Sequence, residues 1–488
     1  MTAFSKKSLG LIAATVAIAF SASAQTFTLD SLRQMALRQS KTMAISQAEE
    51  TKSLHQQKAA RTAYLPKVAL EATYMRTGDE ISLLNDTQKA TLPQMGTSLL
   101  QSLGPDAAVI ASQYPELAAL FPKIGEGLNN AGANLVDALK TDTRNLSLAS
   151  LMLTQPLYMG GKIRAMNQIT DEARLIARQK GRQAEQELLL AVEQAYWQVV
   201  SLSAKRRIAT QYVDMTRRLD DDMKQMIKEG VATKASGLSV SVKAGEAEMT
   251  LTKVDNALTL SRMALCRLCG MPLDTPITLE DEKLEELPPL QTAATDAQTD
   301  TATAFAHRPE LQMLESALTI SRRQVDVARS DFMPQLALTG GLLTTYPGLT
   351  NGFEKKFKGT WAVGVALKVP VWNWGEGRHK VQAARADATI AALQLDEAKE
   401  QIALSLKQAA QRVEEADKQY ALSMRNLSRA DENLYTARQG FAEGVVVTSD
   451  LLSAQTAWVG AQSDKIDAQI DQRISRSALR KAQGILGF

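Results

Sequence analysis

The sequence predicts a mainly α-helical chain with a small transmembrane β-barrel portion. Two proline-free stretches, 162–228 and 376–442, are each about 67 residues long, which is about 100 Å of helix. Four shorter segments alternate apolar with small or polar residues, as half-buried strands do. The chain also repeats itself, so we expect two similar halves, each with two long antiparallel helices and two strands.

The repeat is clearest at two short turns. Glu229-Gly230-Val231 returns 214 residues later as Glu443-Gly444-Val445, and Gly270 returns at the same offset as Gly484. Pro66 pairs with Pro334 at an offset of 268, so the halves differ mainly by an insertion of 54 residues in the first half.

Residues 1–24 have the pattern of a secretory signal peptide. Lys6 and Lys7 precede an apolar core, and Ala22-Ser23-Ala24 provides small residues for cleavage. No cysteine sits at this junction, so we expect the mature chain to begin at Gln25 without a lipid anchor.

The first repeat covers residues 25–270. A helix is expected from Leu29 to Ala63, with Asp30 or Ser31 as its N-cap. Strands are expected at about 65–76 and 145–156, on either side of an extracellular insertion at about 77–144 with short helical patches such as Pro115 to Phe121. Long helices follow at 162–228 and 237–270.

The second repeat covers residues 301–488 and follows a linker or equatorial segment at 271–300, of which 281–300 is acidic and then rich in Thr and Ala. A helix is expected from Ala304 to Ser330, then strands at about 333–346 and 359–371. Long helices at 376–442 and 449–486 complete the half.

The strands have the length and pattern of membrane-spanning strands. Trp361, Val363 and Val365 alternate with Ala362 and Gly364, giving one apolar face and one small-residue face. Large aromatic side chains flank one end of the strands, as at a membrane interface; they are Tyr64, Tyr158, Phe332, Trp372 and Trp374. Four such strands leave open edges in lipid, so the barrel is expected to close by oligomerisation, with twelve strands from three copies.

The turn after the long helix at 376–442 is marked by residues that end one helix and begin the next. Gly444 is expected to end that helix with a positive φ angle. Thr448 and Ser449 are the expected caps of the next helix, and Asp450 lies in its first turn. Apolar residues recur every seven positions along the long helices, for example Val413 and Leu427, which indicates coiled-coil-like packing.

Composition and motifs argue against several functions. The net charge of +3 and the sparse aromatic residues do not fit nucleic-acid binding. His55, His307 and His379 lack metal-ligand spacing, and no catalytic or phosphate-binding motif is present, so we expect no enzyme activity, metal or cofactor. Cys266 and Cys269 are either a disulfide or redox pair, or two small apolar residues near a helix end.

The whole mature chain resembles the TolC-type outer-membrane efflux proteins. The resemblance rests on the two-fold repeat, the proline-initiated strands after Tyr64 and Phe332, the helix start at His307 to Leu311, and the two Gly-Val turns. It implies a homotrimer with a 12-stranded barrel in outer-membrane lipid and a helical tunnel in the periplasm.

The resemblance also implies partners and a gate. A periplasmic adaptor would dock on the tips formed by Glu229 to Val231 and Glu443 to Val445, and an inner-membrane transporter would supply energy. Asp450 and Ser453 match positions that ring the periplasmic aperture, although Ser453 is not acidic. Phe441 and Val446 stand where the family has a tyrosine-like hydroxyl and an arginine, so this gate is expected to be closed by different contacts.

Two alternatives remain open from the sequence. One is a type I protein-secretion outlet, which has the same architecture. The other belongs to a different class, a periplasmic coiled-coil scaffold without a pore.

Overall fold

The computed structural model describes residues 26–78, 84–113, 119–139, 144–284, 288, 290, 301–348 and 356–487. The expected signal peptide at 1–24 and most of the segment 285–300 lie outside these ranges. The chain forms two compact units. The first takes the described residues of Met1–Leu54, Glu172–Thr319 and Thr389–Phe488, and the second takes those of His55–Asp171 and Ile320–Ala388.

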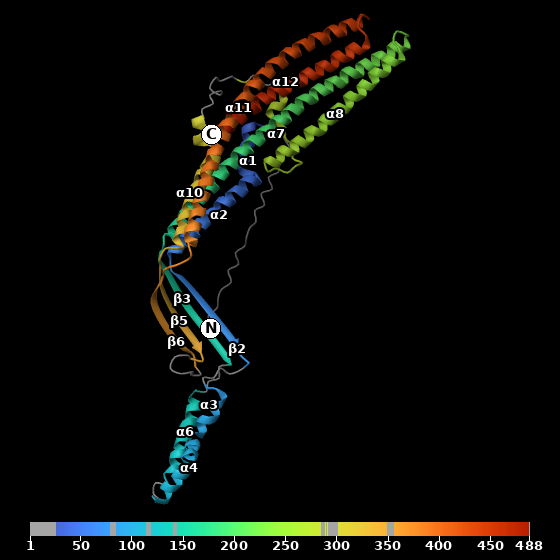
Figure 1. Ribbon diagram of the computed structural model, residues 1–488. Helices are drawn as coiled ribbons and strands as arrows, with labels where there is room; N and C mark the ends of the chain where they lie inside the picture. Colours follow the sequence, from blue (N-terminus) through green and yellow to red (C-terminus); the bar gives the residue numbers. More distant parts are fainter. Residues whose placement is uncertain are drawn as a thin grey trace, which may run out of the picture. The chain divides into compact units, whose positions relative to one another are not determined.

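Four long helices dominate the chain and form two antiparallel pairs (Figure 1). Helix α7 (Lys162–Lys228) pairs with α8 (Lys234–Leu268), and α11 (Glu376–Ala442) pairs with α12 (Thr448–Ala482). The corresponding helices have equal lengths, 67 residues for α7 and α11 and 35 for α8 and α12. Among the described residues, no helix carries an apolar stretch long enough to cross a bilayer.

The seven-residue apolar stripe of α11 is packing, as its spacing predicts. Leu395, Ile402, Val413, Leu427 and Leu434 are all buried, while the residues between them are mostly exposed. Such a seam keeps one side of a long helix against its neighbours. The stripe therefore stabilises the helix pairs and leaves the other side free for solvent or further partners.

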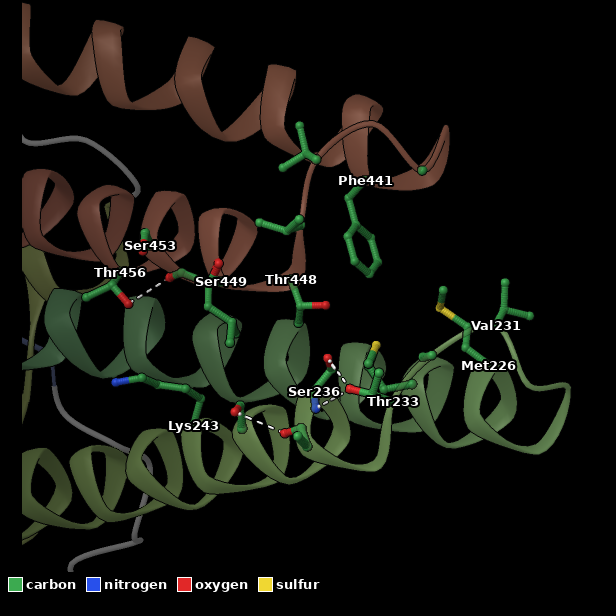
Figure 2. Close-up of a pocket in the computed structure, with 18 of the residues that line it drawn as sticks. Met226, Val231, Thr233, Ser236, Lys243, Phe441, Thr448, Ser449, Ser453 and Thr456 are labelled. Atoms are coloured by element: carbon green, nitrogen blue, oxygen red, sulfur yellow. Dashed lines mark hydrogen bonds between the residues drawn. The ribbon is translucent and has the colours of Figure 1, made fainter.

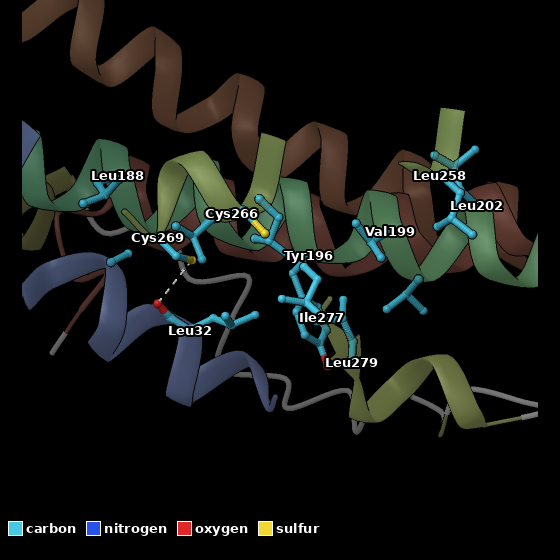
Figure 3. Close-up of a cluster of buried hydrophobic side chains, with 14 residues drawn as sticks. Leu32, Leu188, Tyr196, Val199, Leu202, Leu258, Cys266, Cys269, Ile277 and Leu279 are labelled. Atoms are coloured by element: carbon cyan, nitrogen blue, oxygen red, sulfur yellow. Dashed lines mark hydrogen bonds between the residues drawn. The ribbon is translucent and has the colours of Figure 1, made fainter. Parts of the chain in front are cut away.

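A second core forms where the segment after α8 folds back on α7 (Figure 3). Tyr196 is fully buried there, and its hydroxyl donates to Asp281 Oδ2 at 2.7 Å. Strand β4 (Thr278–Leu279) pairs in parallel with β1 (Thr26–Phe27), and Arg262 forms an ion pair with Glu282 at 2.5 Å. Residues 271–284, part of the expected linker or equatorial segment, therefore pack within the first unit.

Cys266 and Cys269, for which the sequence left two interpretations open, lie in this core as free, buried cysteines. Cys266 Sγ lies 3.8 Å from the carbonyl oxygen of Thr275, and Cys269 Sγ lies 3.8 Å from that of Leu32 (Figure 3). Burial raises the pKa of the Cys269 thiol to about 12 and also raises that of Cys266. These thiols act as small apolar side chains, not as a redox pair.

Each half contains the same glycine contact. Gly270 follows α8 with φ +74°, and a Cβ there would lie 2.5 Å from the carbonyl oxygen of Gln39. Gly484 follows α12 with φ +77°, and a Cβ there would lie 2.8 Å from the carbonyl carbon of His307. Both contacts meet a break between two helices, so glycine is required there for conformation and for space.

Those breaks correct two helix predictions. The helix expected from Leu29 to Ala63 is two helices, α1 (Leu29–Gln39) and α2 (Lys41–Arg61), and Thr28 caps the first in place of Asp30 or Ser31. The helix expected from Ala304 to Ser330 is likewise α9 (Thr301–His307) and α10 (Pro309–Ser330). Pro309 explains the second break, because the residue before proline avoids helical geometry while proline itself suits the first helical position.

The second unit contains one antiparallel sheet in the order β2-β3-β5-β6 (Figure 1). The strands are β2 (Lys67–Arg76), β3 (Asn145–Met159), β5 (Gln335–Tyr346) and β6 (Lys358–Lys368). Strand β3 is three residues longer than expected. Strands β2 and β5 each begin two residues later, and β6 ends three residues earlier.

The register assigns a different character to each face of the sheet. Leu70, Leu151, Leu342 and Trp361 form one row straight across the four strands, and all four are exposed. The neighbouring row on the opposite face is Ala69, Met152, Gly341 and Ala362. Since side chains alternate along a strand, one face of the sheet is broadly apolar and the other is small or polar.

The insertion between β2 and β3 is more helical than the sequence predicts. It contains α3 (Asp86–Thr91), a 3₁₀ turn η2 (Leu92–Gln94), α4 (Met95–Gln113) and α6 (Phe121–Leu139). Gly96 and Gly125 let α4 and α6 approach so closely that a Cβ on Gly96 would overlap the carbonyl of Gly125. Asn129 accepts hydrogen bonds from the backbone N–H groups of Gly96 and Thr97 at 2.8 and 3.1 Å. The helical patch expected from Pro115 to Phe121 lies largely outside the described residues.

Candidate functional site

The two tips of the helix pairs have the same backbone geometry. Gly230 and Gly444 have φ angles of +76° and +74°, the positive values expected from the sequence. The N–H of Val231 donates to the carbonyl of Met226 at 2.9 Å, and the N–H of Val445 donates to that of Gly440 at 2.8 Å. This pattern is the Schellman motif, which ends a helix and reverses the chain.

The caps that follow the two turns differ. Thr233 caps α8, because its side-chain oxygen accepts the N–H of Ser236 at 3.1 Å. At the corresponding position before α12 stands Val447, which has no side chain for capping. Thr448 is the first helical residue, so the expected capping role of Thr448 and Ser449 is wrong. The 214-residue offset aligns Val447 with Thr233, and this alignment was the available signal.

A cavity of about 1150 Å³ lies between the two tips (Figure 2). Its walls come from the ends of α7 and α11 and from the first turns of α8 and α12. Ser453 lies on this wall, whereas Asp450 is exposed and is not among the lining residues. Sequence reasoning missed Lys243, the one charged side chain among the described lining residues, which pairs with Glu246 at 2.7 Å.

Phe441 belongs to the apolar contact between the two pairs. It packs against a cluster with members from both pairs, including Met223 and Val240 of the first and Leu434 and Leu452 of the second. Figure 2 shows the ring pointing from the end of α11 toward the first pair. An aromatic ring without a hydroxyl therefore contributes burial at this point, where a tyrosine would also offer a hydrogen bond.

Three consecutive acidic residues, Asp220 to Asp222, precede the first tip, and the first of them has a structural role. Asp220 accepts a hydrogen bond from Ser241 at 2.5 Å, which joins α7 to α8, and forms an ion pair within α7 with Lys224 at 2.7 Å. The hydrogen bonds from Lys224 and Ser241 lower the pKa of this carboxyl group. Asp221 and Asp222 are exposed, and Asp221 also pairs with Lys224 at 3.1 Å.

Four of the five expected interface aromatics are exposed. They are Tyr64, Tyr158, Trp372 and Trp374, and the last two reach 75 and 87 % exposure. The rings of Trp372 and Trp374 meet edge to face with centroids 5.6 Å apart. Phe332 is half-buried instead, because its ring packs where Gly377 leaves room at the start of α11.

The described residues contain no cluster of three or more His, Cys, Asp or Glu side chains able to hold a metal ion. The sheet and the tips expose apolar side chains, and a cavity lies between the tips.

Comparisons with known proteins agree with this arrangement. Residues 116–271 and 302–485 match the family model "Outer membrane efflux protein". The alkaline protease secretion protein AprF of Pseudomonas aeruginosa is 25 % identical over 385 residues, which cover 77 % of this chain and 79 % of AprF. The outer membrane protein TolC of Escherichia coli is 22 % identical over 383 residues, or 75 % of each chain.

A solved structure has the same fold. The CmeC outer membrane channel of Campylobacter jejuni superposes with a TM-score of 0.72 at 15 % identity, covering 94 % of this chain and 86 % of CmeC. The family match spans more than half of the chain and includes all four long helices in full. The chain therefore belongs to the outer membrane efflux protein family, whose members are passive channels of the bacterial outer membrane and not enzymes.

Proposed function

We propose that three copies of the chain close a 12-stranded barrel in the outer membrane, continued by a twelve-helix tunnel in the periplasm. The observation that supports this most is the open sheet. Within the described residues β2 and β6 are its edge strands, and one face exposes Leu70, Leu342 and Trp361. Unpaired edge groups cost several kcal/mol each in lipid. Eight strands from two copies would fill with side chains, whereas twelve leave an open lumen.

A crosslink across the expected seam tests the trimer. Val68 of β2 and Leu367 of β6 lie on the apolar face, on opposite edges of the sheet. In one chain they are separated by three strand spacings, about 14 Å, and by four further residues along β6, because the row of Val68 reaches Val363; this is too far for a disulfide. The double variant Val68→Cys/Leu367→Cys should therefore give crosslinked dimers and trimers on denaturing gels, while each single variant gives none. If the double variant gives only monomers and carbonate washes the protein off membranes, the barrel is contradicted.

The trimer would serve as the exit duct of a tripartite efflux system. A periplasmic adaptor would dock on Glu229-Gly230-Val231 and Glu443-Gly444-Val445, and an inner-membrane transporter would drive export. Val231 and Val445 are 69 and 79 % exposed, so both tips offer apolar side chains to a partner. A photo-crosslinking residue at Val445 should capture the adaptor in cells. The same residue at Leu260, also exposed but far along α8, is the matched control and should capture none.

The aperture proposal concerns Asp450. One carboxylate per copy in the first turn of α12 would ring the entrance, with Ser453 on the adjacent wall. Its accessibility supports this role, since Asp450 accepts only a 3.3 Å hydrogen bond from neighbouring Ser449 among the described residues. Single-channel recording should show block by a trivalent cation in the native protein and weaker block in Asp450→Asn. Equal block in both would reject the gate role and leave a residue that serves the helix dipole.

Two export roles are both supported. Efflux of small molecules or metal ions fits the family description, and secretion of a polypeptide fits the similarity to AprF, whose name states alkaline protease secretion. Deletion of the gene separates them. Loss of a protein from the culture medium would indicate secretion, whereas higher sensitivity to toxic compounds with unchanged secreted proteins would indicate efflux. Family membership leaves no support for a periplasmic scaffold without a pore.

A further inference from the structure

We propose that Lys67 and Lys368 form a ring of ammonium groups inside the barrel and bind anionic groups of whatever passes through it. This inference rests on the proposed trimer. It adds a binding site and a chemical class of ligand, namely carboxylate, phosphate or sulfate groups.

The strand register gives the face on which these lysines lie. Lys67 aligns across the sheet with Thr154, Thr339 and Gly364, a row of small or polar residues. Lys368 is four positions beyond Gly364 on β6, so it shares that face. The opposite face carries the exposed apolar rows and meets lipid in the proposed barrel. Both lysines therefore face the lumen.

The ends of the strands bring the two lysines together at the seam. Lys67 is the first residue of β2 and Lys368 is the last residue of β6, and both strands are sheet edges. Antiparallel closure of β6 on β2 of the next copy places the end of one beside the start of the other. The sheet is also staggered. On β5, Lys67 aligns with Thr339, whereas Lys368 pairs with Gln335, four residues nearer the start of that strand. Continuing that stagger across the seam keeps both lysines at one rim.

No acidic side chain of the described residues pairs with the positive charge at this rim. Neither lysine has an ion pair or a side-chain hydrogen bond among the described residues. The acidic groups at the adjoining corner are already paired, since Asp331 binds Lys162 at 2.8 Å and Glu376 binds Lys380 at 2.5 Å. Glu71 shares the lumen face, but it lies four residues along β2, about 13 Å away. On the lumen face of the described strands, the two lysines at this rim of each copy therefore have Glu71 as a distant carboxylate and no closer one.

Planar-bilayer recording with tripolyphosphate as the probe tests the ring. In 0.1 M KCl, tripolyphosphate added on one side should block the native channel. The variant Lys67→Gln/Lys368→Gln should need at least about tenfold more for half-block, because the attraction of several ammonium groups is lost. Block of the native channel should nearly vanish in 1 M KCl, where the Debye length falls from about 10 to about 3 Å.

Two further variants isolate the effect of charge at this place. Lys67→Arg/Lys368→Arg keeps the charge and should keep the native block. Arg76→Gln removes one charge from the far end of β2, at a position on the apolar face of the sheet. It should also keep the native block. If the Lys67→Gln/Lys368→Gln variant forms open channels that tripolyphosphate blocks as well as it blocks the native channel, the lysine ring is wrong and the proposed channel is unaffected. The lysines would then only keep the edge strands of unassembled chains from pairing wrongly. Absence of any channel would overturn the proposed function and the ring together.

Discussion

Gly270 and Gly230 have nearly the same backbone conformation but different surroundings, so alanine at the two positions separates conformational strain from overlap. Their φ angles are +74° and +76°. A Cβ on Gly230 would meet nothing within 4 Å, whereas one on Gly270 would lie 2.5 Å from the carbonyl oxygen of Gln39. The substitution Gly230→Ala therefore reports the backbone cost alone.

The magnitudes follow from these two environments. A left-handed conformation costs a residue with a Cβ about 1–2 kcal/mol, and alanine recovers roughly 0.4–1 kcal/mol by restricting the unfolded chain. Gly230→Ala should thus lose about 1 kcal/mol or less. Gly270→Ala adds overlap with a backbone atom that cannot rotate away, and overpacking of this kind costs about 1–3 kcal/mol. We expect a total loss of about 2–4 kcal/mol.

Thermal unfolding of the purified protein, followed by circular dichroism at 222 nm, measures the difference. Gly270→Ala should melt clearly below Gly230→Ala, which should stay close to the native protein. The second half repeats the comparison, since Gly484 is crowded by His307 and Gly444 is open. Equal losses at the crowded and open positions would refute the argument, because the overlap would then contribute nothing.

Three other predictions concern the tips and the core. Val447→Thr should add the missing cap and slow amide exchange in the first turn of α12, while Thr233→Ala should speed exchange in α8 by the equivalent of about 1 kcal/mol. The lowered pKa of Asp220 contributes stability that is present above its unfolded-state value of about 3.9 and is lost as the pH falls through the lower folded value. In the native protein, protection of the α7 and α8 amides against hydrogen exchange should fall below about pH 4, and Asp220→Asn should weaken this pH dependence. If the variant loses protection over the same pH range as the native protein, the pairing of Asp220 with Lys224 is not the cause. Cys269, fully buried with a pKa raised to about 12, should resist iodoacetamide at pH 8 until the protein is unfolded, and rapid labelling of the native protein would contradict its place in the core.

The long helices and the tips were accessible from the sequence because their signals are local. A glycine stops each long helix, and α11 repeats its apolar residues every seven positions without proline. The alternation in β6 likewise needs only one strand to be recognised. These patterns depend on neighbours within one or two turns, so a single sequence displays them.

Other features depend on distant contacts and were missed for that reason. The break at Ser40 has no proline, and it coincides with the approach of Gly270 from the end of α8. Only short helical patches were predicted in the insertion, whereas Gly96, Gly125 and Asn129 serve close packing of long helices there. At the candidate site the turn glycines were predictable, but the cavity and the orientation of Phe441 depend on how two helix pairs meet.

The strand order has a consequence for the time course of assembly. Strands β2 and β3 pair early in the sequence, but β3 also pairs with β5, which joins residues near 150 to residues near 340. Such long-range pairing is slow to form. Until the second half has been exported, β3 has one unpaired edge and the apolar face of a two-stranded ribbon is uncovered. The nascent first half should therefore be the species that periplasmic chaperones bind and that proteases remove when synthesis is interrupted.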